Sequence, residues 1–133
     1  MPDSIQLSSI FPVTPDELYR AWLNSDEHTA FSGGEAEVTP KVGTEFSAWD
    51  GYITGKNLEL YPGRKIIQSW RTDEFEDTDA DSRLEIQLEA VPGGCKLTLL
   101  HTGIPDGEGE KYAEGWEEHY FVPMRVYFSE NDL

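Results

Sequence analysis

Residues 112–128, YAEGWEEHYFVPMRVYF, carry large and partly polar side chains at steps of three and four positions. Such steps bring side chains onto one face of an α-helix, so this stretch predicts a helix with an aromatic stripe. Since Leu, Ile and Val would be enough for burial alone, the rings indicate either a core built on aromatic side chains or the lid of a cavity. The members of the stripe are Tyr112, Trp116, His119, Tyr120, Pro123, Met124 and Tyr127.

Pro123 interrupts the hydrogen bonding of this predicted helix. A proline has no N–H to donate to the carbonyl of His119, four residues earlier, so we expect the helix to bend near that point. The bend would let the helix follow a concave surface.

Upstream of that helix, the sequence predicts one strand and then two short helices. The alternation of apolar and polar residues in 4–11 is typical of a half-buried strand. Thr14 is placed to cap the first helix, with Pro15 at its first position. Ser25 is the expected cap of the second helix, and the glycines at 33–34 are expected to end it.

From residue 35 onward the pattern changes to strands separated by turns. Alternating apolar residues mark the strands, and Asp50-Gly51 is the strongest two-residue hairpin signal in the chain. In the last predicted strand, Leu97, Leu99 and His101 share one face. The expected strands are residues 43–49, 52–61, 64–72, 82–91 and 95–103.

This order of elements predicts an α+β fold. An antiparallel meander needs a cover on one face, and the final helix is the only predicted element long enough to provide it. We therefore expect a curved antiparallel sheet wrapped around the C-terminal helix, with a pocket where the two do not touch. The chain has 133 residues, a common domain size, so we expect residues 1–133 to form a single domain.

The charge of the chain excludes several classes of partner. Its 26 acidic and 10 basic residues give a net charge of −16, and the basic residues form no cluster. Nucleic acid and anionic membrane surfaces are therefore unfavourable partners. No apolar run approaches the roughly 18 residues that cross a bilayer, and the first residues lack the pattern of a signal peptide. We expect a cytoplasmic protein, monomeric or homodimeric, that does not insert into membranes.

Four stretches, taken together, resemble one known family. They are FPVTPDELYRAWLNSDEHTAFSG at 11–33, DGYITGKNLELYPGRKIIQSWR at 50–71, LTLLHTGIP at 97–105 and EGWEEHYFVPMRVYF at 114–128. The sequence is similar to the homologues of the heat-shock protein 90 ATPase activator, within the START/Bet v 1-like superfamily. The resemblance covers nearly the whole chain. It implies the helix-grip fold, with two short helices after the first strand and a curved sheet around the last helix.

The resemblance implies two functions of different kinds. In eukaryotic members this domain accompanies an N-terminal domain that engages the chaperone and stimulates ATP hydrolysis, whereas stand-alone members bind small ligands under the long helix. Our main hypothesis from the sequence is binding of a small apolar or amphipathic molecule, without catalysis and without a cofactor. One alternative is a chaperone co-factor whose acidic surface docks on a basic patch. A second alternative is a cyclase-like or hydrolase-like enzyme that uses the same cavity.

The residues expected to face the bound molecule are mainly aromatic. His101 is the one histidine among them, and its inward position predicts either a hydrogen bond to the ligand or a buried ring satisfied by the protein. For the enzymatic alternative, His101 and Tyr52 are the candidate acid–base pair. The expected ligand-binding residues are Phe31, Phe46, Trp49, Tyr52, Trp70, Leu99, His101, Trp116 and Tyr120.

The three histidines do not predict a metal site. Zinc needs a compact cluster of ligands, and His28, His101 and His119 lie on separate predicted elements. His28 stands among polar residues and is expected at the surface, whereas His119 is expected to have a structural role.

The acidic stretch 73–82 has, from Asp77 onward, the alternating carboxylates of a calcium loop but not its other requirements. An EF-hand loop needs glycine at its sixth position and a carboxylate at its twelfth, and these places hold Ser82 and Leu88. The stretch therefore predicts a solvated hairpin loop. Cys95, the single cysteine, has no histidine nearby in sequence and is expected to be structural.

Overall fold

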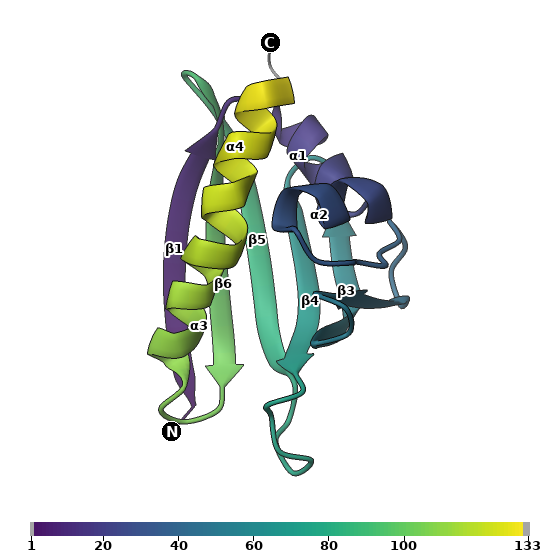
Figure 1. Ribbon diagram of the computed structural model, residues 1–133, viewed down its shortest axis with the longest axis vertical. Helices are drawn as coiled ribbons and strands as arrows, with labels where there is room; N and C mark the ends of the chain where they lie inside the picture. The colour runs from purple at the N-terminus through teal and green to yellow at the C-terminus, as the bar shows by residue number, and fades with distance from the viewer. Residues whose placement is uncertain (1, 132–133) are drawn as a thin grey trace.

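The computed structural model describes residues 2–131 and consists of a six-stranded antiparallel sheet with helices on one face (Figure 1). The strand order is β1-β6-β5-β4-β3-β2. The strands are β1 Asp3–Phe11, β2 Glu45–Ala48, β3 Ile53–Tyr61, β4 Lys65–Thr72, β5 Ser82–Val91 and β6 Gly94–Ile104. The helices are α1 Pro15–Trp22, α2 Ser25–Ser32, α3 Gly109–Trp116, the π-helical turn η1 Glu117–Phe121 and α4 Val122–Asn131.

The predicted fold class is confirmed: a curved sheet holds the C-terminal helical segment against its inner face. In Figure 1 this segment, α3 to α4, runs along β1 and β6, while α1 and α2 lie beside it on the same side of the sheet. Alternating residues of β5 and β6 point toward the helices, and Leu84, Ile86, Leu97 and Leu99 are fully buried there. Among the described residues, no helix combines the length and apolar character needed to cross a bilayer.

The N-terminal cap of α1 is the residue predicted from the sequence, whereas the cap of α2 is a different one. The side chain of Thr14 accepts the backbone N–H of Glu17 at 3.1 Å, as the capping pattern predicts. Asn24, and not the expected Ser25, caps α2 by accepting the N–H of Glu27 at 2.9 Å. Ser25 instead exchanges hydrogen bonds with the backbone of Val38, which fastens the chain after α2.

The C-terminal helical segment contains a π turn just before Pro123, the residue at which the sequence predicts a bend. The backbone N–H of Val122 reaches the carbonyl of Glu117, five residues back, so the turn Glu117–Phe121 is wider than an α-helical one. This widening changes the rotational phase of the helix just before the proline.

The π turn keeps one line of side chains on the sheet. The buried positions recur every four residues, and each such step rotates about 40° beyond a full turn of an ordinary α-helix. A wider turn in the middle of the segment offsets part of this drift. The members of this line are Tyr112, Trp116, Tyr120, Met124 and Phe128, and Phe121, next to Tyr120, is buried as well.

The hairpin between β2 and β3 forms where Asp50-Gly51 predicts it, but its backbone is unusual. Trp49 and Asp50 have φ angles of 52° and 58°, in the left-handed region that bulky residues rarely adopt. Nothing in the sequence predicts a left-handed backbone conformation at Trp49. The conformation turns the indole back over the inner face of the sheet, beside Gly34.

A glycine on β3 creates room for an aromatic row across the sheet. Phe46, Gly55 and Trp70 are cross-strand neighbours on β2, β3 and β4. A Cβ atom at Gly55 would lie 2.6 Å from the Phe46 ring and 1.9 Å from the carbonyl oxygen of Ser69. The absence of a side chain at Gly55 is therefore what allows this row to pack.

Replacing Gly55 with alanine is expected to destabilise the protein by about 1–3 kcal/mol, because the added methyl group overpacks a well-filled site and displaces backbone. Gly115→Ala is the matched control, since a Cβ there meets no atom within 4 Å. Urea unfolding of the two variants measures the difference. Equal stabilities for both would contradict the packing described.

Candidate functional site

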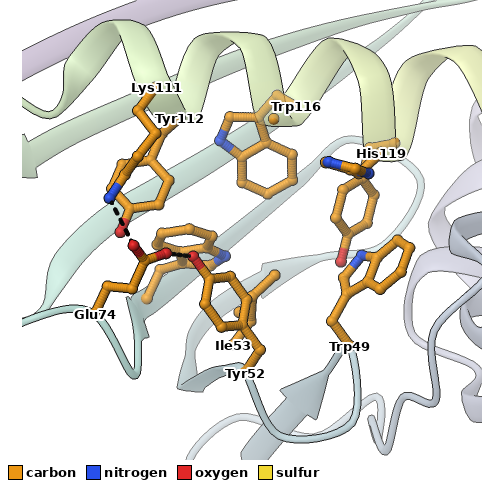
Figure 2. Close-up of a pocket in the computed structure, with 11 residues that line it drawn as sticks. Trp49, Tyr52, Ile53, Glu74, Lys111, Tyr112, Trp116 and His119 are labelled. Carbon is orange, nitrogen blue, oxygen red and sulfur yellow. Dashed lines mark hydrogen bonds and ion pairs between the residues drawn. The ribbon is translucent and has the colours of Figure 1, made fainter.

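A pocket of about 380 Å³ lies between the C-terminal helical segment and the sheet. Figure 2 shows that Lys111, Tyr112, Trp116 and His119 descend from the helix, while Trp49, Tyr52 and Ile53 rise from the opposite side. The volume falls in the range of small-molecule sites. The lining residues are Trp49, Tyr52, Ile53, Trp70, Glu74, Lys111, Tyr112, Gly115, Trp116, His119 and Tyr120.

The pocket exists because the helix does not fill the space above β3 and β4. Gly115 lines it from α3, and a Cβ atom at that position would meet no other atom within 4 Å. A glycine inside a helix costs roughly 1 kcal/mol relative to alanine. Gly115 therefore lowers helix stability and leaves the pocket roof open.

A polar network crosses one side of the pocket mouth. The hydroxyl of Tyr52 donates to Glu74, and the ammonium of Lys111 lies 3.2 Å from both Glu74 and Glu108. The hydrogen bonds from Tyr52 and Lys111 lower the pKa of Glu74. Burial and the bond to Glu74 raise the pKa of Tyr52. This side of the mouth thus carries an ionised carboxylate whose charge is already matched.

The acidic loop after β4 holds Glu74 in place. Arg71 donates to the backbone carbonyls of Glu76 and Asp79 and forms an ion pair of 2.7 Å with Asp81. The ring of Phe75 is buried against Trp70 and Tyr112. The stretch predicted as a solvated hairpin loop is therefore fastened to the pocket wall at one end.

The opposite side of the pocket is formed by two rings. The indole of Trp49 meets the imidazole of His119 edge to face, with ring centroids 5.5 Å apart. The Trp49 indole N–H is shielded from water and has no hydrogen-bond partner among residues 2–131. His119 is exposed and contacts a pocket ring, so the sequence-based expectation of a purely structural role misses its position at the pocket wall.

His101 lies outside the pocket and ties the helix to the sheet. The indole N–H of Trp116 donates to its Nδ1 at 3.1 Å, so Nδ1 carries no proton and Nε2 does. Nε2 then donates to the Ser82 hydroxyl at 2.7 Å, and that hydroxyl donates to the carbonyl of Trp70 at 2.6 Å. Burial lowers the pKa of His101 from 6.5 to about 3, so the ring stays neutral.

His28 has an analogous role in the other half of the fold, which makes the expectation of a surface position wrong. Its side chain is buried, and both ring nitrogens have partners there. Nδ1 donates to the carbonyl of Trp22 and Nε2 accepts from the hydroxyl of Tyr120, both at 2.9 Å. Burial lowers the pKa of His28 from 6.5 to about 4. The polar neighbours in the sequence lie on the other faces of α2 and concealed this position.

Five of the nine residues expected to face a ligand line the pocket: Trp49, Tyr52, Trp70, Trp116 and Tyr120. The other four are buried elsewhere and do not line it.

Those four residues pack in the core. Phe31 packs on Trp22, and Phe46 over Gly55. Leu99 is fully buried among inward residues of β6, and His101 has both ring nitrogens engaged.

The candidate acid–base pair of the enzymatic alternative does not form. The hydroxyl of Tyr52 is bound to Glu74, and the ring of His101 is bound to Ser82 and Trp116. His101 is also completely inaccessible to solvent. The expectation of an acid–base pair is therefore wrong. Tyr52 belongs to the polar contacts at the mouth of the pocket, and His101 belongs to those in the core.

The sequence did not single out several lining residues, of which Glu74, Lys111 and Gly115 matter most. Glu74 and Lys111 are charged residues in a highly charged chain, and nothing in the sequence distinguishes them from solvated ones. Gly115 did offer a signal, since a glycine between Tyr112 and Trp116 interrupts a predicted helix for no local reason. In residues 2–131, no group of three or more potential ligand residues is placed to hold a metal ion.

Comparison with known proteins assigns the chain to a family. The sequence pattern of the family described as Activator of Hsp90 ATPase homolog 1-like protein matches residues 12–129. The chain belongs to this family. The resemblance inferred from the four sequence stretches is thereby confirmed.

Relatives and solved structures agree with this assignment. The chain is 28% identical over 127 residues to an activator of 90 kDa heat shock protein ATPase homolog from Dictyostelium discoideum, and 29% identical over 126 residues to homolog 1 from Homo sapiens. These matches cover 95% and 93% of the chain but only 33% and 36% of the relatives, so the chain spans about a third of their length. A crystal structure described as an HSP90 activator from Plasmodium falciparum superposes with a TM-score of 0.86 at 27% identity, covering 95% of this chain and 96% of that one.

The two buried histidines make folding stability depend on pH. The unfolded chain takes up protons below about pH 6.5, whereas the folded pKa values of His101 and His28 are about 3 and about 4. Stability is therefore expected to fall as pH drops from 7 toward 4, by up to about 1.4 kcal/mol per pH unit for each histidine. Urea unfolding at several pH values measures this slope.

Glutamine variants separate the histidines from the carboxylates. His101→Gln and His28→Gln each remove one titrating group, so each variant is expected to be less stable at pH 7 and to lose less stability on acidification than the unmodified protein. The acidic residues contribute equally to both slopes and cancel in the comparison. Parallel slopes in the variants and the unmodified chain would show that the rings are not held neutral.

Proposed function

We propose that this chain is a partner of an HSP90-class chaperone and stimulates its ATP hydrolysis. The observation that carries the proposal is the family match over residues 12–129. The Plasmodium falciparum protein supports it further, because a chain described as an HSP90 activator aligns over 96% of its length with this single fold. The chaperone contact therefore need not depend on the parts of the longer relatives that this chain does not match.

Charge favours an electrostatic approach to such a partner. The net charge of −16 creates a negative field around the protein, which attracts a basic surface and accelerates encounter. Many of the carboxylates are exposed and not paired in ion pairs of the described residues, so they are available to act at a distance. Salt screens such a field over about 8–10 Å at physiological ionic strength.

We further propose that the pocket binds a small, largely apolar molecule. The supporting observation is a pocket of about 380 Å³ with a wall made mainly of aromatic rings, under a helix that leaves space at Gly115. Excluding water from such a wall would supply most of the binding energy. The chaperone partnership and the pocket involve different features of the molecule and are tested separately.

The chaperone proposal predicts that the purified protein raises the steady-state ATPase rate of an HSP90 from the same organism, half-maximally at roughly micromolar concentration. Raising salt from about 0.05 M to about 0.5 M should weaken the effect, since the Debye length falls. A coupled ATPase assay measures both results. An unrelated protein of similar negative charge is the control. Absence of stimulation at low salt with excess protein would contradict the proposal.

The pocket proposal predicts that Gly115→Leu abolishes binding of phenylnaphthylamine, an uncharged probe whose emission rises in apolar sites. The leucine projects into the open space at the roof and fills it. Folding should be preserved or stabilised by up to about 1 kcal/mol, because leucine is a better helix former than glycine. Gly115→Ala is the matched control with the same helical benefit and an open pocket. Equal probe emission from the unmodified protein, Gly115→Ala and Gly115→Leu would show that the probe binds outside the pocket and would contradict the proposal.

A further inference from the structure

The two sides of the pocket differ in the state of their polar groups. At the mouth, Tyr52, Glu74 and Lys111 satisfy one another. On the opposite side, the Trp49 indole N–H has no partner among the described residues, and the His119 ring contacts Trp49 without a hydrogen bond to any other described side chain. The pocket-lining side-chain donor that is sheltered from water and has no partner among residues 2–131 is therefore at the Trp49 end.

The backbone holds the Trp49 donor in its position at a cost. Trp49 has a φ of 52° and is followed by Asp50 at 58°, two consecutive residues in a region disfavoured for L-amino acids. The indole also lies against Gly34, where a Cβ atom would come within 2.5 Å of the ring. A strained turn, a required glycine and the edge of His119 thus converge to keep this indole at the pocket wall.

A sheltered N–H without an acceptor is uncommon in native proteins, because it loses its hydrogen bond to water and gains none in return. The His119 ring supplies a second nitrogen at the same end, and unlike the indole it is exposed. A bound molecule that carries an oxygen at this end would reach the exposed His119 ring directly, and a small rotation of the indole would give the Trp49 N–H the same acceptor.

We propose that the pocket takes an uncharged, ring-containing molecule that carries a hydrogen-bond acceptor, such as a carbonyl or ether oxygen, oriented toward Trp49 and His119. This inference rests on the proposed binding of a small molecule in the pocket and specifies its class. The flat body lies against the rings of Trp70 and Trp116, which contact each other with centroids 5.5 Å apart and both line the pocket. The orientation is set by the sheltered Trp49 N–H, which has no partner among residues 2–131.

Electrostatics disfavour a negatively charged ligand. The mouth carries the carboxylate of Glu74, which Lys111 already neutralises, and the chain as a whole has a net charge of −16. An anion would have to leave water for an aromatic wall without a free cation among the residues lining it. A neutral acceptor meets neither penalty.

The test compares three probes of nearly the same shape: acetylnaphthalene, ethylnaphthalene and naphthoate. The ketone is expected to bind about threefold to tenfold more tightly than the hydrocarbon, the gain typical of one hydrogen bond, and naphthoate more weakly than the ketone. Proton–nitrogen NMR follows the indole N–H resonances of the four tryptophans during titration. The Trp49 resonance should move downfield with the ketone and not with the hydrocarbon.

Two variants locate the preference. Trp49→Phe keeps a ring and removes the donor, and it also identifies the Trp49 resonance. His119→Phe acts on an exposed position, where the fold tolerates the change. Each is expected to reduce the preference for the ketone over the hydrocarbon. Glu89→Gln, at an exposed position of β5 outside the pocket, is the control and should leave that preference unchanged.

The possible outcomes separate this inference from the proposals on which it depends. Equal affinity for ketone and hydrocarbon, with an unmoved Trp49 resonance, overturns the acceptor while small-molecule binding stands. Tightest binding of naphthoate overturns the uncharged class. Binding of none of the probes overturns the small-molecule proposal together with this inference and leaves the chaperone proposal to its own ATPase assay.

Discussion

One buried chain of hydrogen bonds joins the C-terminal helix to the sheet, from Trp116 through His101 and Ser82 to the carbonyl of Trp70. Each link has a defined direction, because an indole N–H can only donate and a carbonyl can only accept. The imidazole must therefore be neutral and carry its proton on Nε2. A core histidine held this way fixes the height of the helix above the sheet, and the pocket is the space that remains beside it.

The shape of the pocket follows from how the aromatic side chains of the helix are spaced. Steps of four residues would carry them around an ordinary α-helix, and the π turn Glu117–Phe121 counteracts this rotation. Trp116 and Tyr120 consequently remain over the sheet, with their ring centroids 4.8 Å apart. Gly115 adds no side chain to the row, so the sheet beneath it is left uncovered. The aromatic rings of the helix thus form the wall of the pocket, and the absence of a side chain at Gly115 leaves its space open.

The family and the pocket bear on different parts of function. Membership in the family that matches residues 12–129 connects the chain with chaperone activators, whereas the pocket is a local property of this chain's own side chains. Trp49 contributes to both the fold and the pocket: its left-handed backbone helps close the turn between β2 and β3, while its indole N–H lies at the pocket wall without a partner among residues 2–131.

The sequence by itself determined the elements, their order and the side of the final helix that is buried, because periodicity, caps and turn residues are local properties. It also placed His101 on the inward face of its strand. Only the tertiary structure decided that His28 is buried and that Phe31 belongs to the core while Trp49 belongs to the pocket. An inward aromatic residue looks the same in a sequence whether the space before it is filled or empty. That difference depends on contacts between segments far apart in the chain, such as Gly34 with Trp49, and no local pattern records them.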